Sequence, residues 1–213
     1  MNIFITCFDK DAIDISLLNN IEKIKKQNPS YNVVIYDNKS FEEYYKNKNK
    51  YDYENYYCKL NKNIGAMISD YMRYVLLYYE GGIYIDIKSN FKIPINNFID
   101  NQNIFFKWET KAMKEILNWC LIIPNAYSNI MKDMIDNIHN NINNYDFNKI
   151  NIKNTRINVL EFTGPRLLTK VCNKHNIIGI DWHKYLTRVS IKDYKKKYSI
   201  PHYSQVHEHL IIS

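Results

Sequence analysis

The stretch that most constrains the fold runs from Gly65 to Asn90, GAMISDYMRYVLLYYEGGIYIDIKSN. Apolar and aromatic residues occur nearly all round its first half, which is typical of a buried helix. Gly81 suits the left-handed position that ends a helix, and the β-branched run after it predicts a strand over residues 83–87. The stretch therefore predicts a buried helix, a tight turn and a buried strand, around which the rest of the chain is arranged.

Besides Glu80, which directly precedes the double glycine, four charged side chains fall within this otherwise apolar unit. Asp70 and Arg73 are three residues apart, so they share one face of the helix, and Asp86 and Lys88 come at the end of the strand. Charged groups in apolar surroundings cost free energy unless they pair or bind a ligand. The four residues are thus candidate site residues. The simpler alternatives are a structural ion pair for Asp70 and Arg73, a turn cap for Asp86 and a solvent-facing Lys88.

Strands and helices alternate along the chain, which predicts an α/β fold with a mixed central sheet. An apolar run, a helical pattern and a second apolar run open the chain as a β-α-β unit with parallel strands. No repeat or linker interrupts the sequence, so we expect one domain over residues 1–213. The other expected elements are strands at 103–108, 116–123 and 182–186, helices at 128–143 and from 165, and a loop at 144–158.

The net charge is +7 and the sequence pI is about 9.0, which suits an anionic partner such as a nucleotide diphosphate. The only tight basic run is at residues 195–197, and no nucleic-acid-binding motif is present, so we expect no nucleic-acid partner. No apolar run approaches the ~20 residues of a membrane span. Peripheral contact with an acidic membrane surface stays open.

The four cysteines lie far apart without a CxxC pair, which is typical of reduced thiols in a cytosolic protein. The first residues, MNIFITCFDK, have no basic segment and reach Asp9 too early for a signal peptide. The sequence therefore predicts a soluble cytoplasmic protein. Its wealth of Asn, Lys, Ile and Tyr indicates an AT-rich genome, such as that of a large DNA virus or a low-GC bacterium.

Three segments resemble glycosyltransferase family 32, which includes bacterial capsular and yeast sugar transferases and is related to the glucosylating domains of large clostridial toxins. The first is the pattern A-x-x-SDYMRY-x-x-LY-x-x-GGIYIDIK, which runs from Ala66 to Lys88. The second is FTGPRLLT from Phe162, and the third is HYS at residues 202–204. The order of the three matches the family. The resemblance implies a GT-A-type, Rossmann-like fold and a retaining transfer of a sugar from a UDP- or GDP-sugar.

The resemblance also implies roles for the charged residues. Asp70 and Arg73 match the pair that grips hydroxyls of the donor sugar. Asp86 matches the first carboxylate of the Asp-x-Asp motif, near the ribose and the donor sugar. Lys88 stands where the family has its second, metal-binding Asp, so this chain carries a DIK variant of the motif.

The substitution at Lys88 leaves three alternatives for the usual divalent metal, Mn²⁺ or Mg²⁺. The lysine ammonium could replace the metal at the diphosphate. The metal could instead persist on Asp86 with other ligands, His202 or Ser204. The site could also be catalytically reduced and bind without turnover.

Further candidates for binding the donor lie at three other places. Phe8 and the turn after it follow the first strand, and ligands of such sheets bind beyond the carboxyl ends of strands. Phe8 could stack on the donor base or belong to the core. Thr163 and Gly164 open a helix whose N–H groups could hold an anion or simply be capped. His202 and Ser204 belong to the third family segment.

The sequence thus predicts a glycosyltransferase, specifically a hexosyltransferase, with a glycan, glycolipid or protein acceptor. The alternative is a catalytically reduced module that binds a nucleotide sugar or a glycan. Acceptor choice in such enzymes lies in loops, here residues 40–62 and 144–158.

Overall fold

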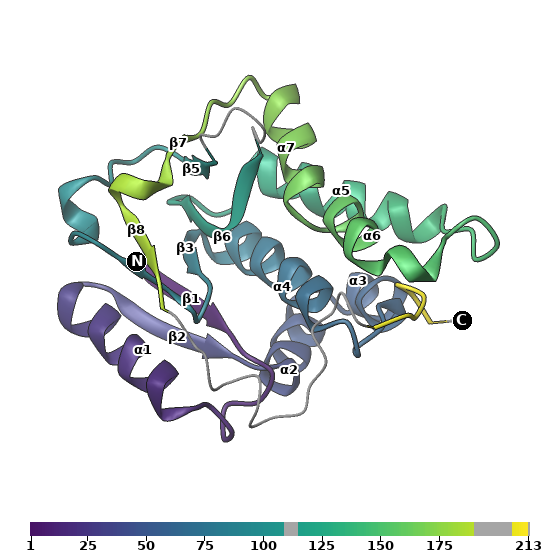
Figure 1. The fold of residues 1–213 in the computed structure, drawn as a ribbon, viewed down its shortest axis with the longest axis horizontal. Coiled ribbons are helices and arrows are strands. Elements are labelled where there is room, and N and C mark those ends of the chain that lie inside the picture. Colours follow the sequence, from purple (N-terminus) through teal and green to yellow (C-terminus); the bar gives the residue numbers. More distant parts are fainter. Residues whose placement is uncertain (109–114, 190–205, 213) are drawn as a thin grey trace.

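A computed structural model describes residues 1–108, 115–189 and 206–212. Its centre is a six-stranded sheet in the order β2-β1-β3-β6-β5-β7, beside a smaller sheet of β4 and β8 (Figure 1). Both parallel and antiparallel pairs occur in the large sheet. The predicted α/β fold with a mixed central sheet is therefore confirmed.

The elements alternate along the chain much as the sequence predicts. The strands are β1 (Asn2–Thr6), β2 (Asn32–Tyr36), β3 (Gly82–Ile85), β4 (Ser89–Phe91), β5 (Ile104–Lys107), β6 (Ile116–Ile123), β7 (Ile180–Asp181) and β8 (Leu186–Arg188). The α-helices are α1 (Ile15–Gln27), α2 (Asn38–Lys48), α3 (Lys50–Asn55), α4 (Gly65–Glu80), α5 (Asn129–Asn143), α6 (Thr155–Phe162) and α7 (Pro165–Lys174). Short 3₁₀ turns occupy Tyr57–Lys59, Ile95–Asn97, Ile152–Asn154 and Trp182–Lys184.

The two faces of the sheet are covered by different helices. Phe4 of β1 packs in the cluster formed with α2, α4, α5, α6 and α7, while Ile3 and Ile5 pack in the cluster with α1 and the small sheet. This alternation follows from the two-residue period of a strand. Figure 1 shows α1 beside β2, and α4 to α7 gathered on the other side of the sheet. Among these described helices, none combines the length and the apolar character that crossing a bilayer requires.

The central strand β1 fixes the edge at which a site can form. It pairs in parallel with β2 on one side and with β3 on the other. The carboxyl ends of β1 and β3 therefore lie at the same edge of the sheet, where Thr6 ends β1 and Asp86 follows β3. The predicted parallel β-α-β opening is confirmed, with Asp14 accepting a hydrogen bond from the Ser16 N–H at the start of α1.

Three expectations about local structure are wrong. The strand expected over 83–87 ends at Ile85, because the Asp86 carbonyl accepts from the Ser89 N–H at 2.8 Å and closes a tight turn. The loop expected over 144–158 contains the start of α6, whose Thr155 side chain is buried. The strand expected over 182–186 begins as a 3₁₀ turn, since the Asp181 carboxylate accepts from the His183 N–H at 3.0 Å.

Tyrosines fill much of the core next to α4. The hydroxyl of Tyr71 lies 3.0 Å from the Tyr45 hydroxyl and 2.7 Å from His139 Nε2. The His139 ring stacks on Tyr56 with 3.6 Å between the ring centroids. Burial lowers the pKa of His139 to about 4, so the imidazole is neutral at physiological pH.

We expect Gly82→Ala to destabilise the fold and Gly65→Ala to leave it intact. Gly82 has a φ of 104°, and an added Cβ would lie 2.7 Å from the Asn2 carbonyl oxygen of β1. The strain and the close contact together predict a loss of about 2 kcal/mol or more in the free energy of unfolding. Gly65 begins α4, and a Cβ there meets nothing within 4 Å. Urea unfolding of both variants checks this, and equal losses would contradict it.

We expect His139 to make stability depend on pH. Its pKa is about 4 in the folded protein and about 6.5 when unfolded, so the unfolded chain takes up the proton first as pH falls. Folding stability is therefore lost between pH 6.5 and pH 4, and about 2 kcal/mol of that loss falls between pH 7 and pH 5. His139→Gln should remove this part of the pH dependence of the free energy of unfolding. Urea unfolding at both pH values measures the difference, and equal pH slopes would refute the assignment.

Candidate functional site

Arg73 lies between two carboxylates at the edge where β1 and β3 end. Its Nη2 atom is 3.2 Å from Asp70 Oδ1 and 3.3 Å from Asp86 Oδ1. Asp70 and Arg73 share one face of α4. The double glycine connects α4 to β3, and Asp86 follows β3 directly. Three of the four charged residues predicted from the sequence are thus brought together by the helix-turn-strand unit.

The guanidinium of Arg73 is fully engaged although the residue is buried. Nε donates to the Ser69 carbonyl at 3.1 Å, Nη2 donates to Ser69 Oγ at 3.1 Å and Nη1 donates to the Asn118 carbonyl. The group also lies over the ring of Tyr84, 4.4 Å from its centroid. A buried cation is stable only when it is paired and hydrogen-bonded in this way. Arg73 is therefore a fixed positive charge beneath Asp86.

Asp70 is the buried partner of Arg73. Its Oδ1 accepts from Asn118 Nδ2 at 2.7 Å, and its Oδ2 accepts from Thr163 Oγ1 at 3.0 Å. Burial raises the pKa of the Asp70 carboxyl to about 7, against the opposite pull of Arg73 and the two donors. Both oxygens are thus used within the protein. Contact of Asp70 with a donor sugar stays a prediction.

Asp86 is the most open of the three residues, with 31% of its side chain exposed. Its Oδ1 accepts from the Tyr84 hydroxyl at 2.8 Å. That hydroxyl also lies 2.8 Å from Thr6 Oγ1 and 3.1 Å from Ser69 Oγ. Arg73 and Tyr84 therefore hold the Asp86 carboxylate on its protein side, and the rest of the side chain is partly exposed to solvent.

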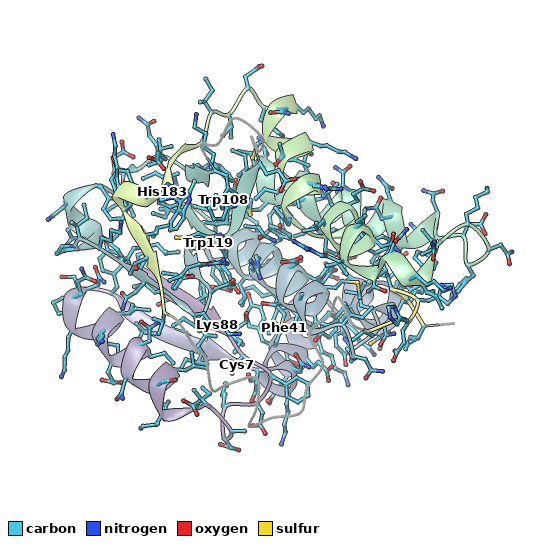
Figure 2. The ribbon with its side chains drawn as sticks, viewed as in Figure 1. Cys7, Phe41, Lys88, Trp108, Trp119 and His183 are labelled. Atoms are coloured by element: carbon cyan, nitrogen blue, oxygen red, sulfur yellow. The ribbon has the colours of Figure 1, made fainter. Side chains whose placement is uncertain are left out.

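Lys88 lies on the tight turn two residues after Asp86, and its side chain is exposed. Asn20 of α1, itself buried, fixes this turn by donating from Nδ2 to the Ile87 carbonyl at 3.0 Å and to the Ser89 carbonyl at 2.9 Å. The Lys88 carbonyl accepts from the Val189 N–H at 2.8 Å. In Figure 2, Lys88 and Cys7 lie at the edge where β3 and β1 end. The fourth charged residue thus joins the same edge.

Aromatic side chains gather near the small sheet, where Figure 2 labels Trp108 and Trp119. The Trp119 carbonyl accepts from the Asp86 N–H at 2.8 Å, and the Trp119 ring lies 5.3 Å from that of Trp182. Trp182 is in turn 5.1 Å from Trp108, and Arg188 lies over Trp119 at 4.9 Å. Trp119 is itself buried and packs in the cluster on the α1 face of the sheet, whereas Tyr84 packs in the cluster on the α4 face.

The remaining predicted residues have different positions. Phe8 follows β1 and is 58% exposed, so the core alternative for it is wrong, while its contact with a base stays a prediction. The N–H groups of Thr163 and Gly164 both donate to the Val159 carbonyl, at 3.1 and 3.0 Å. Binding of the donor by these two residues stays a prediction. His202 and Ser204 lie outside the described residues.

Potential metal-ligating side chains are not clustered among the described residues. Within residues 1–108, 115–189 and 206–212, no three His, Cys, Asp or Glu side chains are grouped so that they could hold a metal ion. Asp86 already shares one oxygen with Arg73 and Tyr84. The position two residues on, where the family motif has a second carboxylate, is Lys88.

Sequence reasoning missed the residues that hold the charged network, chiefly Asn118 and Tyr84. Asn118 is a polar residue in the middle of the apolar run ILNWCLII, and that contrast is a signal for a buried polar contact. Tyr84 falls two residues before Asp86, on the same face of the strand. Asn20 showed no signal, because its turn partners lie in a distant part of the sequence.

Two comparisons with known proteins found a match. Residues 16–105 match a family model described as a glycosyltransferase sugar-binding region containing a DXD motif. The solved structure of PaToxG Glycosyltransferase is similar with a TM-score of 0.56 and 18% identity, covering 82% of this chain and 69% of that one. No curated protein sequence matches the chain. The structural similarity shows a fold shared with that protein, consistent with the GT-A type, and the family model supports the glycosyltransferase superfamily.

We expect Tyr84→Phe to destabilise the protein and Tyr57→Phe to leave its stability unchanged or slightly higher. Both tyrosines are fully buried, and each change removes one hydroxyl group. The Tyr84 hydroxyl bonds to the Asp86 carboxylate, and a hydrogen bond to a charged group contributes about 1.5–3 kcal/mol. The Tyr57 hydroxyl has no hydrogen-bond partner among the described residues. Urea unfolding compares the two variants, and equal effects would contradict the proposed network.

Proposed function

We propose that this protein is a retaining glycosyltransferase that moves a hexose from a UDP- or GDP-sugar to a glycan, glycolipid or protein acceptor. The observation that carries the proposal is the buried Asp70–Arg73–Asp86 network at the carboxyl ends of β1 and β3. This network lies inside the segment that matches a glycosyltransferase sugar-binding region. Ligands of α/β sheets bind at this edge.

The chemistry of sugar transfer suits such a network. As the bond to the nucleotide breaks, the anomeric carbon becomes cationic and the diphosphate gains negative charge. In this proposal, the partly exposed carboxylate of Asp86 accepts hydrogen bonds from the donor. Arg73 keeps Asp86 in one orientation, and Asp70 keeps Arg73 in place. Fixed charges of this kind stabilise a transition state without having to reorganise.

We propose that Lys88 supplies positive charge at the donor diphosphate. An ammonium is a compact point charge, and Lys88 stands on a turn that Asn20 fixes at the edge of the site. It takes the place of the carboxylate that would otherwise hold a divalent metal. A metal held by Asp86 with His202 or Ser204 remains the alternative for this position.

Lys88 also favours a second candidate function, a catalytically reduced module that binds a nucleotide sugar or a glycan. A single ammonium carries half the charge of Mn²⁺ or Mg²⁺, so the diphosphate is a poorer leaving group beside it. The cytoplasmic location and the absence of a nucleic-acid partner remain proposals as well. They rest on the free cysteines and on the lack of a dense basic run.

The test is donor hydrolysis with a panel of UDP- and GDP-hexoses, measured by chromatography of the released nucleotide with EDTA or with Mn²⁺. We expect turnover in EDTA. Asp86→Asn and Lys88→Ala should each lower it about 100-fold or more, as expected when a fixed charge at the reacting centre is lost. Lys26→Ala, which removes an exposed lysine on α1, should leave it unchanged.

The possible outcomes separate the two functions. Turnover that needs Mn²⁺ would refute the proposal that Lys88 replaces the metal, but it would support the proposal that the protein is a glycosyltransferase. Donor binding without turnover, together with metal-dependent turnover in Lys88→Asp, would favour the binding module. If calorimetry shows that no nucleotide sugar binds, both functions fail.

A further inference from the structure

A cavity lies at the opposite end of the sheet from Asp86. Strand β3 is antiparallel to β6, with Gly82 paired to Ile123 and Ile85 paired to Cys120. The chain that leaves β6 after Ile123 therefore emerges at the end of β3 that is remote from Asp86. A cavity of about 450 Å³ opens there. Its lining includes Asn103, Asn125, Tyr127, Ser128, Asn129 and His175.

The lining of this cavity is polar but uncharged. Among the described residues that line it there is no Asp, Glu, Lys or Arg, and Asp133 already holds the His175 imidazole, at 2.9 Å from Nε2. Within the described part of the chain, the amides of Asn103, Asn125 and Asn129 form no hydrogen bond. Each amide offers two donors and an acceptor. Such a surface suits a neutral ligand rich in hydroxyl groups and gives no preference for an anion.

Tyr127 supplies the aromatic part of the lining and is held in an unusual backbone conformation. Its φ is 59°, which is rare for a bulky side chain and costs about 1–3 kcal/mol. Burial does not offset this cost, because the residue is 62% exposed. Its ring is set edge to face against Tyr78 and Tyr79, with centroid distances of 5.5 and 6.2 Å. The strain thus presents an oriented aromatic ring to solvent beside unpaired amides.

We infer that this cavity is a carbohydrate-binding site, separate from the edge at Asp86, that takes neutral sugar units of a glycan. The apolar C–H face of a sugar ring packs against an aromatic ring, and its hydroxyls pair with amides that can both donate and accept. Tyr127 and the three asparagines provide these two kinds of contact. The inference does not depend on whether the Asp86 edge transfers sugars, because it concerns a different part of the molecule.

The experiment is a titration of the full chain with neutral oligosaccharides, followed by saturation-transfer NMR and calorimetry. The probes are maltopentaose, cellopentaose, mannopentaose and chitopentaose. We expect at least one to bind, and we expect Tyr127→Gly to weaken that binding about tenfold or more, equal to about 1.4 kcal/mol. Because glycine adopts positive φ freely, this variant should keep its thermal midpoint. Asn125→Ala is a second variant that should also weaken oligosaccharide binding.

Two controls separate this site from the rest of the surface. Tyr51→Ala removes a tyrosine on α3 that is 67% exposed and should bind the oligosaccharide as the parent does. Asp86→Asn should also bind it unchanged, and Tyr127→Gly should hydrolyse donors as the parent does. The inference is overturned if no probe binds, if Tyr127→Gly and Asn125→Ala both bind normally, or if Asp86→Asn abolishes binding.

Discussion

The contact on which the site depends is the guanidinium of Arg73 held between Asp70 and Asp86. A cation buried to this extent would be expelled or would unfold its surroundings if it were not paired. Its partners come from α4, from the end of β3 and, through Asn118, from β6. Thr163, just before α7, completes the shell around Asp70. The charge pairing thus fixes how α4 and α7 pack against the strands, and the packing in turn keeps the charges out of water.

The opposite face of the sheet contributes through a neutral contact. Asn20 of α1 reaches the carbonyls on both sides of Lys88 and so sets the course of the turn after Asp86. Asn90 Nδ2 donates to Asn20 Oδ1 at 2.9 Å, which fixes the orientation of the Asn20 side-chain amide. The guanidinium of Arg73, from the α4 side of the sheet, and the amide of Asn20, from the α1 side, therefore both contact the chain at the end of β3. Asn20 holds the turn that carries the exposed Lys88, while the buried charges lie on the α4 side.

The sequence was sufficient to predict the unit that carries the site. Helical spacing places Asp70 and Arg73 on one face of α4. The double glycine predicts a tight turn from α4 into β3, and this turn brings Asp86, at the end of β3, close to both residues. The sequence could not predict that Asn118 is their partner, because that depends on the register of β6 against β3 and on the irregular pairing of β6 with β5. The turn at Lys88 was also missed, since apolar residues continue past Ile85 and a strand pattern does not show where pairing stops. The aromatic group around Trp119 depends on the small sheet, whose two short strands are nearly one hundred residues apart.

The double glycine also links the two ends of the sheet. Gly81 has a φ of 63°, and a Cβ on it would lie 2.8 Å from the Pro124 carbonyl oxygen and from the Ala126 nitrogen. Only a residue without a side chain lets the chain after β6 pass this close to the end of α4. That close passage allows the Tyr127 N–H to donate to the Tyr78 carbonyl and sets the Tyr127 ring against Tyr78. The residue pair that turns α4 into β3, and so positions Asp86, therefore also shapes the neutral cavity at the far end. A glycine substitution that moves this loop would therefore change both ends of the sheet together.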